Sequence, residues 1–221
     1  MTIMKTTINK FRLYYLAILG GLVLITSCNK DLEQLAPIPT PVYPTGNGIA
    51  ATLAANANYS FYSALITRAG MTTTLNDLTK SFTLFATDNN GMRIFVSAAS
   101  GGAIPPTGAP DATYLGFINT NLPAASAAGI VQYNTVGQKF PAASIGNSFP
   151  NYPITTQIIL DPTQPFVRMN IFPVRGTFSY VNNVPLIGTD MAAANGIIHT
   201  GFSVAAPPSA TLKTMLAGET S

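Results

Sequence analysis

The chain has 221 residues, of which 9% are charged, and 11 Lys and Arg against 8 Asp and Glu give it a formal net charge of +3. Three of the basic residues, Lys5, Lys10 and Arg12, lie in the first 27 residues, so the remainder holds 8 basic and 8 acidic residues and is neutral. A neutral remainder lacks the basic surface that nucleic-acid binding needs, and we expect no nucleic-acid partner.

The N-terminal segment is typical of an export signal. Its basic head precedes a 13-residue apolar run, Leu13–Ile25, which is shorter than the roughly 20 residues that span a bilayer. The run closes at Ile25-Thr26-Ser27-Cys28, which resembles a bacterial lipobox and so implies lipidation of Cys28 and cleavage before it. We therefore expect a signal peptide over residues 1–27 and a membrane anchor at Cys28, stable with two or more acyl chains. The alternative is a free thiol in an ordinary apolar segment.

Residues 28–45 are predicted to form an extended tether, because they hold Pro37, Pro39, Pro41 and Pro44. The run Lys30–Glu33 resembles the charged tag that sends some outer-membrane lipoproteins to the cell surface, and ordinary solvated charges explain it equally well. We expect a lipid-anchored protein of the cell envelope, in the outer membrane, with surface display if the tag is read. Cys28 is the only cysteine, so no internal disulfide is possible and packing must stabilise the fold.

Helical spacing marks the start of the folded region. Asn58–Gly70 carries apolar residues at spacings of three to five. Asn58 or Ser60 is its expected N-terminal cap, and Gly70 its left-handed end. A further helical turn is expected around Leu75.

The next element is a strand over Phe82–Ala86, on which Phe82 and Leu84 share one face and Thr83 and Phe85 the other. We expect this apolar strand, with the helix after it, to form part of the core.

Side-chain oxygens follow this strand. Thr87, Asp88 and Asn89 can accept free N–H groups at a helix start, so we expect a capped helix over residues 89–95. Asp88 and Asn89 have a second interpretation, an exposed polar pair that faces a partner, and capping is the one we favour.

The stretch 97–129 is rich in Ala, Gly and Pro, and is expected to be mostly loop and the most variable surface. Within it Ala112–Ile118 is predicted as a helix capped by Asp111. Tyr114 and Phe117 form either an exposed aromatic contact or the buried face of this helix, and the spacing favours the buried face.

The rest of the chain has β character, beginning at Ile130–Val136. Asn182-Asn183 suits a tight hairpin because asparagine tolerates positive φ. Pro207 and Pro208 are expected to end the last strand. The later strands are expected at Gln157–Leu160, Phe166–Phe172, Gly176–Val181, Val184–Thr189 and Gly196–Val204.

Three stretches, in this order, resemble the motifs of the fasciclin family. The first, Ser81–Met92, matches at Phe82, Thr83, Phe85, Ala86 and Asn89. In the central motif Tyr133 matches, while Asn134 stands in place of the family's histidine. The last, Thr189–His199, matches at Asn195, Gly196, Ile198 and His199.

The resemblance covers roughly residues 46–208 and leaves 209–221 as a tail or the start of a further module. It implies an α+β domain, a wedge-shaped β-sandwich with short packed helices, in which the matching residues are mainly structural. It also implies extracellular adhesion or binding, to a protein or a glycan, without catalysis or a cofactor. Asparagine does not titrate near neutrality, so any function that rests on the family's central imidazole is in question here.

A second hypothesis comes from another class: a glycan-binding or accessory protein, or a hydrolase, of an outer-membrane polysaccharide uptake system. A hydrolase needs two close acids, whereas the acids of the folded region are widely spaced in the sequence. They are Asp77, Asp88, Asp111, Asp161 and Asp190.

His199 is the only histidine. A catalytic role would need a serine or an acid nearby, such as Asp190, and a structural histidine bonded in the core is the interpretation we favour. One histidine and no cysteine in the folded part are too few ligands for a zinc-type site. An oxygen-only Ca²⁺ site stays open, because backbone carbonyls leave no trace in a sequence.

Overall fold

The computed structural model describes residues 40–147 and 153–208. The chain divides into two compact units, Met1–Val42 and Tyr43–Ser221, and the fold below is that of the second unit. The predicted signal peptide, Cys28, most of the predicted tether and the predicted tail 209–221 lie outside the described residues. In the part of the chain that is described, no helix has both the length and the apolar content to cross a membrane.

Helices dominate the first half of the domain and strands the second, which is the α+β class expected from the sequence. The helical elements are α2 (Ile49–Ala54), η2 (Ala57–Tyr59), α3 (Ser60–Arg68), α4 (Thr72–Leu75), α5 (Asn89–Ala99), α6 (Asp111–Gly116), η3 (Phe117–Asn121), α7 (Ala124–Tyr133) and η4 (Ala142–Ser144). The strands are β1 (Phe82–Thr87), β2 (Thr135–Val136), β3 (Ile154–Ile159), β4 (Arg168–Ile171), β5 (Pro173–Arg175), β6 (Ser179–Val181), β7 (Val184–Ala193) and β8 (Gly196–Gly201).

Within the described residues, eight strands form one ladder in the order β4-β3-β2-β1-β8-β7-β6-β5. β1 lies near its centre, antiparallel to β2 and parallel to β8, with Phe82 opposite Gly196 and Thr87 opposite Gly201. All six residues of β1 are buried, and the strand belongs to the core as expected. The first and last of the three motifs therefore lie on neighbouring strands.

The ladder curls so that its two ends meet. β4 and β5 stand at opposite ends of the strand order, yet only Phe172 separates them in the chain. The N–H of Asn182 donates to Phe172 O at 3.0 Å, and the N–H of Phe172 donates to Asn182 Oδ1 at 2.8 Å. Asn182 and Asn183 have φ values of 45° and 65°, which confirms the predicted hairpin between β6 and β7. The sheet is therefore a barrel-like sandwich.

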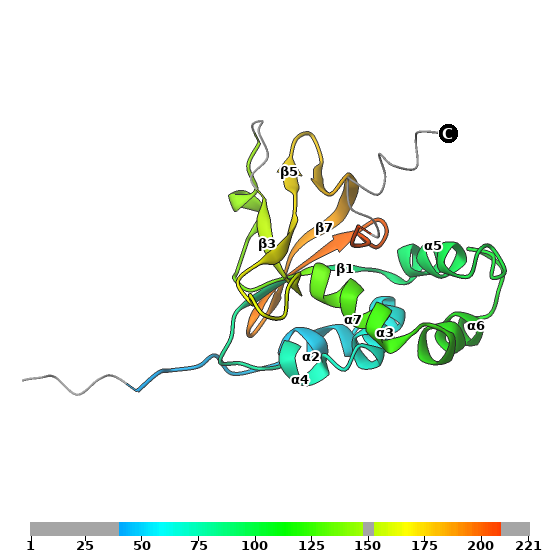
Figure 1. Cartoon of the computed structure of the whole chain (residues 1–221), viewed down its shortest axis with the longest axis horizontal. Helices are drawn as coiled ribbons and strands as arrows, with labels where there is room; N and C mark the ends of the chain where they lie inside the picture. The colour runs from blue at the N-terminus through cyan, green and yellow to red at the C-terminus, as the bar shows by residue number, and fades with distance from the viewer. Residues whose placement is uncertain (1–39, 148–152, 209–221) are drawn as a thin grey trace, which may run out of the picture. The chain divides into compact units, whose positions relative to one another are not determined.

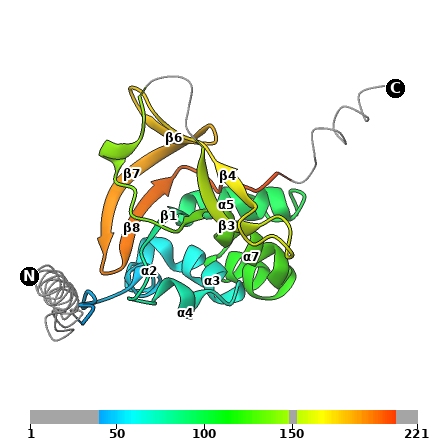
Figure 2. The same cartoon turned by 60° about the vertical axis from the view of Figure 1, so that its left-hand side comes forward.

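Two apolar cores lie on the two sides of β1. Phe82 and Leu84 point into the first, which the helices complete, and Phe85 points into the second, inside the curl. Figure 1 and Figure 2 show α2, α3, α4 and α7 on one side of β1 and the curled strands on the other. The second core also contains Tyr133, Val136, Ile145, Ile171, Val181, Leu186 and Ala205.

The prediction of a strand over Ile130–Val136 was wrong for most of its length. Helix α7 runs to Tyr133, and only Thr135–Val136 is strand. The reason lies upstream, where Pro123 and an alanine-rich run open a helix that continues through the β-branched Ile130 and Val131. Packing of this helix on the first core overrides the local β preference, because Ile130 and Val131 are both buried.

Several predicted helix caps were also wrong. Neither Asn58 nor Ser60 caps α3; Asn56 caps the preceding turn η2 instead. Asp111 is the first residue of α6 rather than its cap. Gly70 does end the α3 region, with φ of 68°.

Other predicted boundaries moved. The stretch 97–129 is less irregular than expected, because it holds α6, η3 and the start of α7. In the first core Tyr114 is fully buried and stacks on Phe61 at 5.7 Å, as the buried-face interpretation requires. β8 ends at Gly201, well before the double proline.

Candidate functional site

Two residues of the first motif, Asp88 and Asn89, follow the end of β1. Asp88 Oδ1 accepts the N–H of Gly91 at 2.8 Å and so caps α5. Asn89 reaches the start of α3 instead: its Oδ1 accepts the N–H of Phe61 at 3.1 Å, and its Nδ2 donates to Ala57 O at 2.9 Å. Asp88 therefore has the capping role predicted from the sequence, whereas Asn89 lies inside α5 and serves the start of α3 instead.

Asn195, in the turn between β7 and β8, ties three segments together and is fully buried. Its Oδ1 accepts the N–H of Ile49 at 2.9 Å, which opens α2. Its Nδ2 donates to Leu75 O at 3.0 Å and to Asp77 O at 3.1 Å, which close α4. A fully buried amide whose oxygen and nitrogen both bond to the backbone of the fold is structural.

Gly196 follows it and sets how closely β8 approaches β1. A Cβ added at Gly196 would collide with Phe82 O and Ile49 Cδ1. Only glycine fits this position without movement of the backbone of β1.

His199, on β8, is fully buried and uses both ring nitrogens. Its Nδ1 accepts the N–H of Asp190 at 3.2 Å, so the proton sits on Nε2, which donates to Phe140 O at 2.9 Å. The ring stacks on Phe85 with centroids 5.4 Å apart. Burial lowers the pKa of His199, while the Phe140 carbonyl and the Asp190 carboxylate oppose that shift.

Asp190 contacts His199 through its backbone, whereas its carboxylate accepts the N–H of Ala142 at 2.9 Å. The pair lacks the carboxylate-to-imidazole hydrogen bond of a catalytic dyad. The geometry supports the structural interpretation of His199.

Thr83 and Phe85 hold the other face of β1. Thr83 Oγ1 donates to Gln138 O at 2.7 Å and accepts the N–H of Phe140 at 2.7 Å. The N–H of Phe85 donates to Asn134 O at 2.9 Å. These bonds fix the segment after β2 against the central strand.

The central motif, at the end of α7, is hydrogen-bonded to three later segments of the chain. Asn134 Nδ2 donates to Ala205 O at 2.8 Å, which holds the segment after β8 against α7. Tyr133 OH donates to Asn170 O at 3.2 Å and accepts from Asn182 Nδ2 at 2.5 Å. Partial burial raises the pKa of Tyr133. Asn134 therefore replaces the family's histidine with an amide that is used internally.

The acids of the folded region are each used locally. Asp77 accepts from Thr79 and Lys80, Asp88 caps α5, Asp111 pairs with Arg93, Asp161 accepts from Thr163, and Asp190 accepts from Ala142. Among the described residues, no group of three or more His, Cys, Asp or Glu side chains is placed to hold a metal ion.

Neither the known protein families nor the curated proteins include a match to this chain. A match among solved structures is a FAS1 domain pair from the insect cell adhesion molecule fasciclin I. It has a TM-score of 0.55 and 12% sequence identity, over 73% of this chain and 51% of that chain. The fold is fasciclin-like. The chain spans about half the length of the structure it matches.

The motif residues of the fasciclin-like domain bond within the fold, so the candidates for contact with a partner are three features of the surface. The first is a hollow of about 640 Å³ beside β3, in which Arg168 Nη1 donates to Gln157 Oε1 at 3.0 Å. Its lining combines apolar side chains with amides, hydroxyls and one arginine. The lining includes Val136, Phe140, Ile154, Pro173, Gln138, Ser144, Thr155, Gln157 and Arg168.

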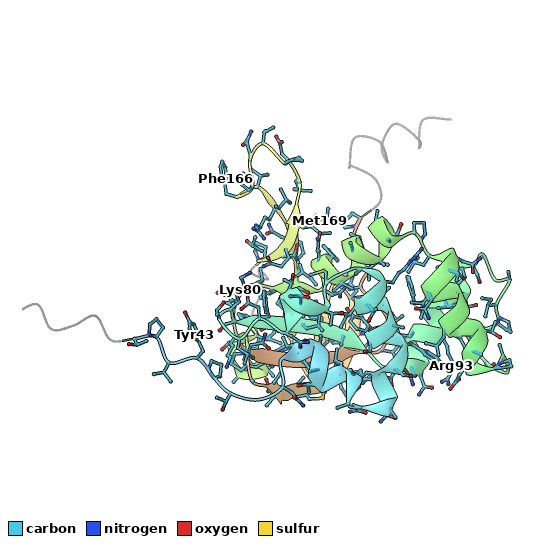
Figure 3. The ribbon with its side chains drawn as sticks, turned by 90° about the horizontal axis from the view of Figure 1, so that it is seen from below. Tyr43, Lys80, Arg93, Phe166 and Met169 are labelled. Carbon is cyan, nitrogen blue, oxygen red and sulfur yellow. The ribbon has the colours of Figure 1, made fainter. Side chains whose placement is uncertain are left out.

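The second feature is the loop between β3 and β4, Ile159–Val167, called here the β3–β4 tip. Phe166 is 78% exposed and Leu160 53% exposed, while Ile159 and Val167 are 43% and 37% exposed. Figure 3 shows Phe166 at the end of a hairpin that projects from the domain. The backbone is closed by a bond from Leu160 N–H to Val167 O at 2.9 Å.

The third feature, called here the α5 hollow, has a volume of about 630 Å³. Arg93 lies in its wall with the guanidinium 5.3 Å from the Phe61 ring centroid and 5.6 Å from that of Tyr114. Arg93 also pairs with Asp111 at 2.8 Å and keeps a quarter of its side chain exposed. The lining consists of Asn90, Arg93, Ile94, Pro106, Thr107, Gly108, Ala109 and Phe202.

Sequence reasoning missed all three features. The strand predictions Gln157–Leu160 and Phe166–Phe172 were wrong at these ends, because β3 stops at Ile159 and β4 starts at Arg168. A signal was present, since Pro162 and Pro165 between the two segments favour a loop. Large apolar residues in a proline-bounded loop have no core to enter. The two hollows left none, because their walls come from segments far apart in the chain.

Proposed function

We propose that this chain is a lipid-anchored lipoprotein of a bacterial cell envelope, in the outer membrane, whose fasciclin-like domain is a non-catalytic extracellular adhesion or binding module. The observation that carries the proposal is the internal use of the motif residues. The polar side-chain atoms of Asn195, His199 and Asn134 are hydrogen-bonded to the backbone of the fold. Contact with a partner then falls to the exposed surface.

Two further observations support the proposal. The matching FAS1 pair comes from a molecule described as a cell adhesion molecule. Cys28 follows an apolar run that is typical of an export signal.

The anchor is tested with a Cys28→Ala variant expressed in a Gram-negative host. The unchanged chain should incorporate labelled palmitate and partition into detergent, and the variant should do neither. Protease treatment of intact cells then reports surface display. A mature product of the unchanged chain that carries no fatty acid would remove the anchor from the proposal.

The binding role is tested by coupling the domain to beads and measuring adhesion to cells and extracellular proteins. Beads coated with heat-denatured domain are the control. The non-catalytic assignment fails if the chain hydrolyses a polymer and loses that activity on His199→Gln or Asp190→Asn while it stays folded.

A second candidate, a glycan-binding component of a polysaccharide uptake system, is favoured by the hollow beside β3. A lining that combines amides, hydroxyls and an arginine with apolar side chains suits sugar hydroxyls and ring faces. A glycan array separates the two candidates. Glycan binding that Gln157→Ala abolishes, with Gln164→Ala on the neighbouring loop as control, would assign this second function.

A further inference from the structure

We propose that the hollow beside β3 binds an acidic glycan, a polysaccharide whose repeat carries a carboxylate or a sulfate ester, and that Arg168 holds the acidic group. The proposal rests on the second candidate function above and names the class of its ligand. It is carried by the charge of the lining, by the hydrogen-bond donors that the fold leaves unused there, and by the bonds that fix one wall of the hollow.

Positive charge predominates in and around the hollow. Arg168 is the charged residue of the lining, which contains no acid. Lys139 lies between two lining residues, and Arg175 follows a third on the same strand, β5. The acids of this region, Asp161 and Asp190, stay outside the lining and accept hydrogen bonds from their own neighbours. An acidic ligand therefore meets a cation in the hollow and no carboxylate of the lining.

The guanidinium of Arg168 is held in place by neutral groups. Its Nε donates to Pro165 O at 3.1 Å, and its Nη1 donates to Gln157 Oε1 at 3.0 Å. Arg168 forms no ion pair within the described residues, and its Nη2 makes no hydrogen bond to any of them. The two bonds fix the guanidinium without neutralising its charge. The N–H groups that remain suit a carboxylate or a sulfate, which a guanidinium binds through paired hydrogen bonds.

Gly137 makes room for the amide that holds Arg168. A Cβ added at Gly137 would lie 2.7 Å from Gln157 Nε2. The amide of Gln157 therefore lies against the backbone of Gly137, and its Nε2 makes no hydrogen bond to a described residue. This places amide donors beside the guanidinium, where they can reach the hydroxyl groups next to the acidic group of a sugar.

The rest of the lining suits the neutral parts of a sugar. The side chains of Gln138, Ser144 and Thr155 line the hollow and make no hydrogen bond within the described part of the chain. Phe140 and Pro173 add apolar surface, against which the C–H face of a sugar ring can pack. The volume of about 640 Å³ falls within the roughly 300–1,000 Å³ of small-ligand sites.

The wall formed by residues 138–146 is fixed from inside the domain. Thr83 Oγ1 donates to Gln138 O and accepts the N–H of Phe140, both at 2.7 Å. His199 Nε2 donates to Phe140 O at 2.9 Å. Thr83 and His199 are motif residues, so the buried bonds of the motifs position the wall before a ligand arrives. A wall that is already ordered loses little freedom on binding, which favours affinity.

The first experiment is isothermal titration calorimetry of residues 28–221 with Cys28→Ser, a chain that contains the whole compact unit and carries no lipid. The probes are a galacturonate hexamer, the methyl ester of that hexamer, and a sulfated carrageenan hexamer. At least one acidic hexamer should bind. If it is the galacturonate, its methyl ester should bind at least about tenfold more weakly, because the ester removes the charge-assisted hydrogen bonds to Arg168.

The second experiment supplies Arg168 with a carboxylate from the protein itself. Gln157→Glu has almost the shape of the original side chain and keeps the bond to Arg168, so the melting temperature should not fall. Affinity for the acidic hexamer should drop at least about tenfold, because the introduced carboxylate competes with the ligand and repels it. A purely structural role of Arg168 would leave the affinity unchanged.

Arg168→Gln should weaken binding of the acidic hexamer by a similar factor. Arg93→Gln is the matched control, since it also removes one positive charge. Figure 3 shows Arg93 on α5, far from Met169, which is the neighbour of Arg168 on β4. Its affinity should stay within about twofold of that of the unchanged chain, because exposed charges at such a separation are screened by salt. Gln157→Glu decides alone if Arg168→Gln does not fold.

The proposal is overturned if neither acidic hexamer binds, if the methyl ester binds as tightly as the acid, or if Gln157→Glu leaves the affinity unchanged. Preference for one acidic hexamer supports it and tells a carboxylate from a sulfate ester. Neutral glycans that bind in the hollow and depend on Gln157 would overturn the acidic ligand and keep the second candidate function. Lipidation of Cys28 and adhesion to proteins are tested separately, so failure here is distinguishable from failure of the proposed function.

Discussion

Single buried polar side chains carry the long-range order of this domain. Asn195 joins the β7–β8 turn to α2 and α4, and Asn134 joins α7 to the segment after β8. In the described residues, every buried side-chain nitrogen or oxygen has a hydrogen-bond partner. Removing one of these groups leaves its partners buried and unsatisfied, which costs more than the bond itself contributes.

Asn195→Ala should lower the free energy of unfolding by about 2–4 kcal/mol, because it strands the Ile49 N–H and the Leu75 and Asp77 carbonyls. Urea unfolding followed by circular dichroism measures the change. Asn58→Ala, at an exposed asparagine, is the control and should stay within about 0.5 kcal/mol. Equal effects of the two substitutions would show that the hydrogen bonds of Asn195 do not stabilise the domain.

His199 gives the domain a defined dependence on pH. Its pKa in the folded state is lowered from 6.5, so the unfolded chain binds a proton more readily than the folded one. Stability is then complete above about pH 6.5 and falls as the pH drops from there toward the folded pKa, by at most about 1.4 kcal/mol per unit. The cause is steric as well as electrostatic, since a proton on Nδ1 would face the Asp190 N–H.

Denaturation between pH 7.5 and 5 should show this loss, and NMR of the single histidine reports its titration directly. His199→Asn should be less stable at pH 7.5 but should lose most of the slope. A slope that survives in the variant would assign the effect to another group.

Among the helices and strands, the sequence predicts best where a single local pattern determines the structure and no tertiary contact opposes it. The strand over Phe82–Ala86 followed from its two-residue periodicity and the hairpin at Asn182-Asn183 from turn chemistry, and both are confirmed. Helix α7 was missed because Ile130 and Val131 carry a β preference that packing on the first core overrides. The cap of α3 was missed because Asn89, which supplies it, lies far along the chain.

Glycine substitutions should separate a close approach from a free helix face. Gly196→Ala places a Cβ against the carbonyl of Phe82 and should destabilise the domain by about 2 kcal/mol or more. Gly129→Ala, within α7 with open space at the Cβ position, should stabilise it by about 0.5–1 kcal/mol. Thermal unfolding of both variants checks the opposite signs, and a stabilised Gly196→Ala protein would show that β8 is not pressed on β1.

For the domain as a whole, closure of the sheet could not be predicted from the sequence. Periodicity tells which residues of a strand face inward, but not which strand lies beside it. Neither the parallel pairing of β1 with β8 nor the meeting of β4 with β5 through Phe172 was predicted from the sequence. The same limit hid the two hollows, whose walls come from segments far apart in the chain.

Asn182 should govern this closure. Asn182→Gly keeps the φ of 45° available but removes the side-chain bonds to Phe172 and Tyr133, whereas Asn182→Ala removes them and adds backbone strain. Both should speed hydrogen exchange at the Phe172 amide, and alanine should destabilise more than glycine by about 1 kcal/mol. Unchanged exchange in both variants would place the closure elsewhere.

The outer edge of β5 is not left free, because the Arg175 N–H donates to Gly146 O at 2.9 Å. A sheet rim whose amides are already engaged is a poor template for an added extended peptide. Binding specificity on this fold is then expected in the side chains of the loops. Exchange of a few loop side chains can change the partner while the hydrogen-bonded frame stays the same.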